Sequence, residues 1–207
     1  MLENVNLSLI LLAAFIATVS PGPATLAIAG TSMSLGRKSG LALAAGITTG
    51  SLSWSIAAAL GLGTLMLANA WVFETVRYFG AAYLMYLGYK SARSAFSTKT
   101  LETLKVSGSL VRIYAKGVAL HVTNPKAILF FGSLYAIGMP ADATARDLLI
   151  VIGALGIQSM IIFHGYAVLF SVPATTRIYL RMRRWFEGAF AIGFTVACFK
   201  VLSARIE

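Results

Sequence analysis

Two short motifs interrupt long apolar runs of this sequence and have the chemistry to bind a small polar solute. They are Ser20-Pro21-Gly22-Pro23 and Thr123-Asn124-Pro125-Lys126. A proline has no N–H, and its ring pushes aside the carbonyl four residues earlier, so a regular helix does not continue through it. The glycine between the first two prolines adds backbone freedom. Each motif therefore predicts a broken helix whose backbone polar groups are available for binding.

The carbonyls released by these prolines are the first candidate binding groups. Counting back four residues, they belong to Ala17, Val19 and His121. A free carbonyl accepts a hydrogen bond from an ammonium group, and the N-terminus of the next half-helix attracts a carboxylate. A zwitterionic amino acid carries both groups, although inorganic ions would also suit such a site. The candidate substrate-binding residues are Ala17, Val19, Pro21, Gly22, Pro23, Asn124, Pro125 and Lys126.

Lys126 lies near the middle of its apolar run, too deep for its side chain to reach either membrane face easily. A charge inside a membrane costs about 3 kcal/mol or more and suggests a functional site. Two interpretations remain open: Lys126 acts in transport, or carbonyls of the broken first helix satisfy it and it holds two halves together. Candidates for proton coupling or a polar relay are Lys126, His164, His121 and Ser51. For either histidine, the alternative is a neutral ring hydrogen-bonded to a neighbouring helix.

The composition places these motifs in a membrane. Apolar residues make up 58% of the 207 residues, charged residues only 12%, and the mean hydropathy is +0.80. A soluble domain has about a quarter of its residues charged. We therefore predict an all-α integral membrane protein with six transmembrane helices, the first and fourth broken by proline. The six apolar runs cover 5–31, 40–68, 70–89, 113–138, 148–172 and 186–203.

Basic residues gather in alternate connections between these runs. The net charge is +10, and the Lys and Arg clusters lie at 37–38, 90–112 and 177–184. Such clusters indicate membrane orientation and contact with anionic lipids rather than binding to nucleic acid. They place the basic loops in the cytoplasm and both termini outside, in a multi-pass protein of the bacterial inner membrane. Glu187 lies near the start of the last run, where its side chain is expected to reach the membrane surface.

The two halves of the chain look like an inverted repeat. Within a single membrane domain, residues 1–207, each half (1–105 and 106–207) holds three spans, and an odd number gives the halves opposite orientations. Each half opens with a broken span, and Gly80-Ala81 in the first half resembles Gly188-Ala189 in the second. Interrupted helices in corresponding positions of two inverted halves indicate a transporter binding site near the membrane midplane, with alternating access to the two sides.

Other function classes find little support in the sequence. The single cysteine, Cys198, excludes a disulfide framework and a thiolate metal site. No predicted span holds an aspartate, and the two histidines lack the spacing of a metalloprotease motif. We therefore expect neither an enzyme nor a bound cofactor or metal. Export of a metal or another inorganic ion stays as the alternative function, although carboxylates are missing near the breaks and Lys126 would repel a cation.

The two motifs also resemble those of the LysE/RhtB family of bacterial amino-acid exporters. The resemblance extends over nearly the whole chain and includes the short basic segment Gly36-Arg37-Lys38-Ser39-Gly40. It implies efflux of amino acids or close derivatives, driven by the proton motive force, with protons as the coupling ion.

Two positions depart from that family. Many relatives have asparagine where this chain has Ala24, and an acidic residue where it has Ser51. The resemblance thus leaves open which amino acid is carried and which residue carries the proton. It also leaves the oligomeric state open, a homo-oligomer included.

Overall fold

The computed structural model describes residues 5–20, 22–68, 70–97, 106–140 and 143–203, and these residues form helices joined by short connections. The prediction of an all-α fold is confirmed for this part of the chain. The helices are α1 (Leu7–Val19), α2 (Pro23–Ala68), α3 (Ala70–Ala95), α4 (Leu110–Val122), α5 (Pro125–Gly138), α6 (Ala145–Leu169) and α7 (Pro173–Ser203).

Helix boundaries fall at both proline motifs. Helix α1 ends at Val19 and α2 begins at Pro23, while Pro21 itself lies outside the described residues. Helix α4 ends at Val122 and α5 begins at Pro125. Proline suits the first position of a helix, where its missing N–H would have no partner anyway. Asn124 caps α5, its side chain accepting a hydrogen bond from the Lys126 N–H at 3.0 Å.

Helix α2 bends at Gly36, whose φ of 81° is readily adopted only by glycine. The bend separates a first segment, 23–35, from a second segment, 37–68, so the basic connection predicted at 37–38 is a corner rather than a loop. Beside the bend, Arg37 Nε donates a hydrogen bond to Ser171 Oγ at 3.2 Å. This contact brings together the bend and the turn between α6 and α7.

Two helices in the described residues are long and apolar enough to cross a membrane. They are Pro23–Gly61 and Ala145–Leu169, which contain 18-residue stretches with mean hydropathies of 1.3 and 2.0. The apolar helices beside the motifs, Leu7–Val19 and Lys126–Ala136, are shorter, because each predicted broken span is divided in two. The arrangement of six spans therefore stays a prediction.

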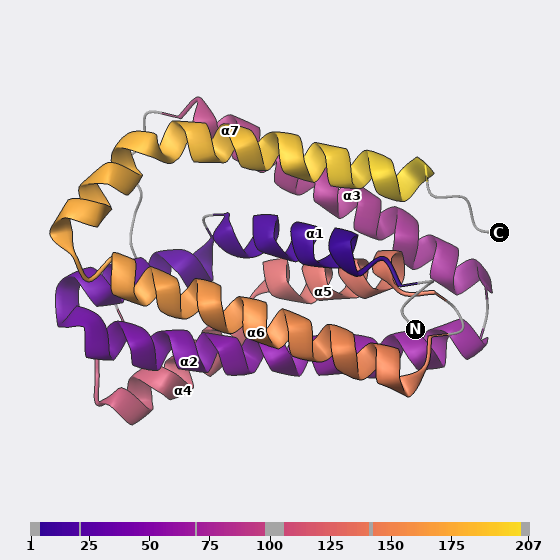
Figure 1. Ribbon diagram of the computed structural model, residues 1–207, viewed down its shortest axis with the longest axis horizontal. Helices are drawn as coiled ribbons and strands as arrows, with labels where there is room; N and C mark the ends of the chain where they lie inside the picture. Colours follow the sequence, from indigo (N-terminus) through magenta and orange to yellow (C-terminus); the bar gives the residue numbers. More distant parts are fainter. Residues whose placement is uncertain (1–4, 21, 69, 98–105, 141–142, 204–207) are drawn as a thin grey trace.

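The helices run side by side along the long axis of the molecule (Figure 1). Helices α3 and α7 pack together on one side, and α2 packs against α4 and α6 on the other. The short helices α1 and α5 lie between these two groups and contact each other; α1 also packs against α6 and α7, and α5 against α3 and α2. The ends of α1 and α5 at the motifs are consequently enclosed by the longer helices.

The outer surface carries large apolar side chains. Leu60, Phe79, Ile161 and Ile192, from four different long helices, are each 64% or more exposed. Water would disfavour so many exposed apolar groups, whereas lipid tails solvate them. This surface fits a protein surrounded by lipid.

Glycines bring α2 and α4 into close contact. A Cβ at Gly46 would collide with the backbone carbonyl of Tyr114, and one at Gly117 would lie 2.6 Å from the carbonyl of Leu43. Gly46 and Gly117 therefore lie at a close helix–helix contact. In lipid, such contacts replace the hydrophobic drive that packs soluble helices.

Replacing Gly46 with alanine tests the importance of this contact. The added methyl meets backbone atoms that cannot turn away, so we expect Gly46→Ala to lose about 1–3 kcal/mol of stability. Thermal unfolding of the purified protein in detergent measures the loss. Gly61→Ala, also in α2, is the matched control, because nothing lies within 4 Å of its added Cβ. Equal melting temperatures for the two variants would contradict the prediction.

Candidate functional site

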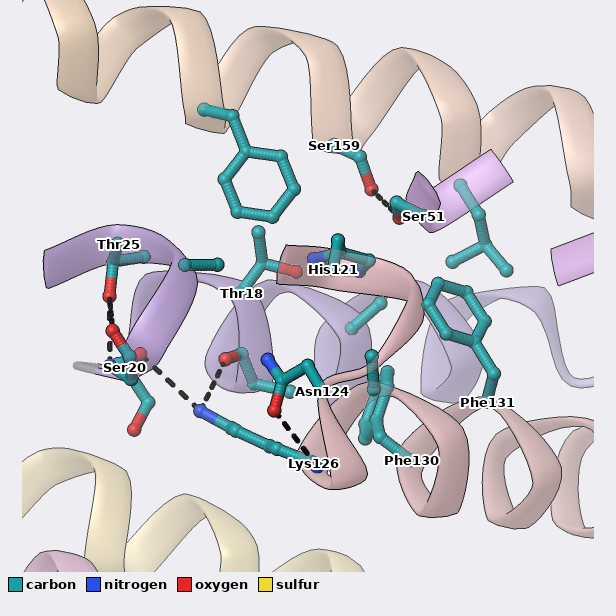
Figure 2. A pocket seen from close by; sticks show the side chains of 17 residues that line it. Thr18, Ser20, Thr25, Ser51, His121, Asn124, Lys126, Phe130, Phe131 and Ser159 are labelled. Atoms are coloured by element: carbon teal, nitrogen blue, oxygen red, sulfur yellow. Dashed lines mark hydrogen bonds between the residues drawn. The ribbon is translucent and has the colours of Figure 1, made fainter. Parts of the chain in front are cut away.

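Lys126 joins the two motifs. From the first turn of α5, its Nζ donates hydrogen bonds to the carbonyl of Ala17 at 3.0 Å and to that of Ser20 at 3.4 Å (Figure 2). The last carbonyls of a helix have no partner within the helix and carry its partial negative charge. An ammonium group satisfies both needs. Gly22 lies beside the ammonium group, and a Cβ there would be in ordinary contact with Nζ at 3.4 Å.

The other two carbonyls expected to be free have protein donors as well. The Tyr166 hydroxyl, from α6, donates to the carbonyl of Val19 at 2.7 Å. The N–H of Asn124 donates to the carbonyl of His121 at 3.1 Å. All three released carbonyls are thus occupied, so a substrate ammonium must displace a donor to reach any of them.

A small cavity lies beside Lys126, between α1, α2, α4, α5 and α6 (Figure 2). Its free volume is about 50 Å³. One water needs about 10–15 Å³ measured in this way, so the cavity holds a few waters and is too small for an amino acid. Its polar lining residues are Thr18, Ser20, Thr25, Ser51, His121, Asn124, Lys126 and Ser159, and its aromatic ones are Phe130, Phe131 and Phe163.

His121 is the least satisfied polar side chain of this cavity. Its ring is buried, and neither nitrogen has a hydrogen-bond partner among the described residues. The ring lies edge-on to Phe163, with centroids 5.8 Å apart. Buried polar groups rarely stay unpaired, because losing water without a new hydrogen bond costs free energy. The imidazole is therefore ready to bind a water or a polar group of a ligand.

Ser51 lies on the far side of the same cavity. Its hydroxyl is buried and shares a hydrogen bond of 3.0 Å with the hydroxyl of Ser159 (Figure 2). The bond joins the second segment of α2 to α6. Ser51 is thus placed with Lys126, His121 and Asn124 around one small space.

His164 does not share that space. It is absent from the described lining of the cavity. Its Nδ1 shares a hydrogen bond of 2.9 Å with the carbonyl of Met160, one turn earlier in α6. A hydrogen bond to a neighbouring helix was one prediction for His164, and the structure shows a bond within its own helix instead.

A second, larger cavity lies on the α3 and α7 side of Lys126. Its free volume is about 310 Å³, and it shares Ser20, Gly22, Asn124 and Lys126 with the first cavity. The lining contributed by the other side consists of Tyr83, Tyr86, Leu87, Lys90, Ser91 and Ser94 from α3 and Glu187 from α7. Lys126 therefore stands between a small space and one of substrate size.

Glu187 is buried in the wall of the second cavity, with 3% of its surface exposed. Its carboxylate accepts a hydrogen bond from Ser94 Oγ at 2.8 Å, and Arg183 donates to the same hydroxyl at 3.0 Å. The expectation that Glu187 reaches the membrane surface is wrong, because the side chain is buried and bonded to Ser94 of α3. One sequence signal could have indicated that Glu187 is inside. Arg183 lies four residues before it, and Glu187 stands at the start of an apolar run.

These features agree with the comparison with protein families. LysE type translocators match residues 15–205, which is most of the chain. The chain belongs to the LysE type translocator family. It is accordingly a transport protein rather than an enzyme, and a multi-pass protein of the inner membrane.

Efflux proteins are among the similar members of this family. The threonine efflux protein of Escherichia coli strain K12 is 30% identical over 189 residues, covering 87% of this chain and 91% of the relative. The homoserine/homoserine lactone efflux protein of Salmonella typhi is 32% identical over 160 residues, covering 77% of each protein. No solved structure matches the chain.

The hydroxyl of Tyr166 gives a direct test of the α1 end. We expect Tyr166→Phe to destabilise the protein by about 1–3 kcal/mol, because the Val19 carbonyl then lacks a donor in a water-poor region. Thermal unfolding in detergent measures the change. Tyr89→Phe is the control, since that side chain is 62% exposed. A Tyr166→Phe protein as stable as the control would show that water or another donor replaces the hydroxyl.

Proposed function

We propose that this protein exports amino acids or close derivatives across the inner membrane through a midplane site at the two proline motifs. The observation that carries the proposal is the Lys126 ammonium held by the carbonyls of Ala17 and Ser20 beside a polar cavity. These carbonyls already bind one ammonium group and are suited to another. The family and the relatives named for threonine and homoserine efflux support the same cargo class.

The polar lining suits small amino acids that carry a hydroxyl. Thr18, Ser51 and Ser159 offer hydroxyl groups, and His121 offers two unpaired ring nitrogens. In the proposed complex, the substrate ammonium replaces the Lys126 Nζ at the carbonyls of α1. The displaced Lys126 then pairs with the substrate carboxylate, so each charge keeps a partner in a medium where an unpaired charge is costly.

An inverted repeat gives this site its two access routes. We take α1 with the first segment of α2 as one broken span and α4 with α5 as the other, which makes six spans in total. The contact between Ser51 and Ser159 supports the pairing of the second segment of α2 with α6. These two residues are 108 positions apart, the same separation as Gly80 and Gly188 in α3 and α7. Alternating access follows if the halves rock about the motifs.

Orientation and coupling complete the proposal. The bend at 37–38, the segment before α4 and the start of α7 carry the basic residues, so this end lies in the cytoplasm and both termini lie outside. The proton motive force drives export. His121 and Lys126 are the groups of the small cavity that can exchange a proton, since Ser51 cannot. His164 and its bond to Met160 lie apart from this relay.

The alternative cargo, a metal or another inorganic cation, has weaker support. Within the described residues, no group of three or more His, Cys, Asp or Glu side chains could hold a metal ion. The first cavity also has a lysine in its wall, which repels cations. Amino-acid export therefore accounts better for the residues at the site.

Loss of Lys126 is expected to stop export. Lys126→Ala should reduce efflux of threonine and homoserine by at least about tenfold, since charge-assisted contacts to the substrate contribute about 1.5–3 kcal/mol. Pro125→Ala should reduce efflux in the same direction, because the added N–H allows the helix to continue through the break. Retention of radiolabelled amino acid in expressing cells measures efflux. Immunoblots of the membrane fraction confirm insertion.

Lys38→Met is the matched control for this experiment, because Lys38 is exposed at the bend of α2. It should insert and export like the unaltered protein. Export at the unaltered rate by both Lys126→Ala and Pro125→Ala would refute the site assignment.

A further inference from the structure

We propose that the cavity between α3 and α7 is a second amino-acid-binding site, in which Glu187 binds the substrate ammonium and Lys90 binds the carboxylate. The inference rests on the proposed function, because it takes an amino acid as the cargo. It assigns the first contact of that cargo to residues outside the two motifs.

Size is the first argument. The cavity has a free volume of about 310 Å³, against about 50 Å³ for the space beside His121. Only the larger cavity accepts an amino acid without rearrangement. It reaches Lys126, which also lines the smaller cavity, so a solute bound there touches the group that closes the midplane site.

The charges of the cavity are the second argument. Glu187 is the one acidic side chain among the described residues that line either cavity. Lys90 and Lys126 line the same space and carry the opposite charge. A zwitterion needs one partner of each sign, and these three side chains supply both. The small cavity alone supplies a cation but no carboxylate.

Hydrogen bonds fix the position of Glu187, which also supports the second site. Ser94 donates to one carboxylate oxygen, Oε1, Ser91 also hydrogen-bonds the carboxylate, and Arg183 donates to the Ser94 hydroxyl. This chain fixes the carboxylate in the wall and leaves its remaining acceptor capacity for a ligand, because a carboxylate has about four acceptor sites. A fixed acceptor binds an ammonium without paying to order a flexible side chain.

The position of the cavity fits capture from the cytoplasm. Its α3 residues, from Tyr83 to Ser94, occupy the last turns of that helix, next to the basic segment that precedes α4. Under the proposed orientation, this is the cytoplasmic end. A substrate bound between Glu187 and Lys90 therefore lies on the cytoplasmic side of Lys126.

The experiment uses three probes that differ in charge. Threonine carries both groups, threoninamide lacks the carboxylate, and N-acetylthreonine lacks the ammonium. Binding to the full-length purified protein in lipid nanodiscs is measured by calorimetry. Glu187→Gln keeps the size of the side chain, and it should weaken threonine and threoninamide binding by about tenfold to a hundredfold while leaving N-acetylthreonine unchanged.

Lys90→Met gives the mirror pattern if the assignment is correct. It should weaken threonine and N-acetylthreonine and leave threoninamide unchanged. Lys90 is exposed, so this variant is expected to fold even if Glu187→Gln does not. Asp147→Asn is the matched control for charge loss, because it removes an acid from the exposed first turn of α6, where an amide can also accept from Thr144.

The outcomes separate this inference from the proposed function. Unchanged affinities in Glu187→Gln and Lys90→Met, or equal weakening of all three probes, would overturn the second site even if the unaltered protein exports threonine. Failure of the unaltered protein to export any amino acid would instead overturn the proposed function. The mirror pattern of the two variants supports the second site.

Discussion

The contact between Lys126 and the carbonyl end of α1 is the interaction on which the rest of the structure depends. A lysine inside a membrane is costly, and so are helix carbonyls without donors. The hydrogen bonds from Nζ to the carbonyls of Ala17 and Ser20 offset both costs, because they pair the ammonium group and give the carbonyls a donor. The contact also ties α5 to α1, two short helices that pack against the longer ones. The Lys126 ammonium group thus stabilises both the end of α1 and the position of α5.

Close packing of α2 against α4 and α6 positions the other residues of the site. Gly50 of α2 leaves room for His121 of α4, whose Cβ would lie 2.9 Å from a Cβ placed on the glycine. The next residue of α2, Ser51, faces α6 and contacts Ser159. The small residues that hold α2 against α4 and α6 therefore also fix the distances across the small cavity. Helix packing and the proposed binding thus both depend on α2.

The sequence predicted what depends on local chemistry. Proline chemistry predicted interruptions at both motifs, where helix boundaries do lie, and the apolar composition indicated an all-α membrane protein. Contacts between residues far apart in the chain could not be predicted from the sequence. Tyr166 as the donor to Val19, and Ser94 as the donor to Glu187, join residues 147 and 93 positions apart. No local pattern encodes such a pair, so Glu187 was placed at the surface although its partners hold it inside.

The position of Lys126 between the two cavities suggests how a gate avoids leaking. On the proposed mechanism, moving Nζ away from the α1 carbonyls opens the small cavity and leaves those carbonyls without a donor, which is unfavourable in a water-poor site. A substrate ammonium removes that penalty by taking the vacated place, and its carboxylate stabilises the displaced lysine. An empty carrier or a neutral solute offers neither compensation. Opening is therefore favourable only with the cargo bound, which couples selectivity to movement through one side chain.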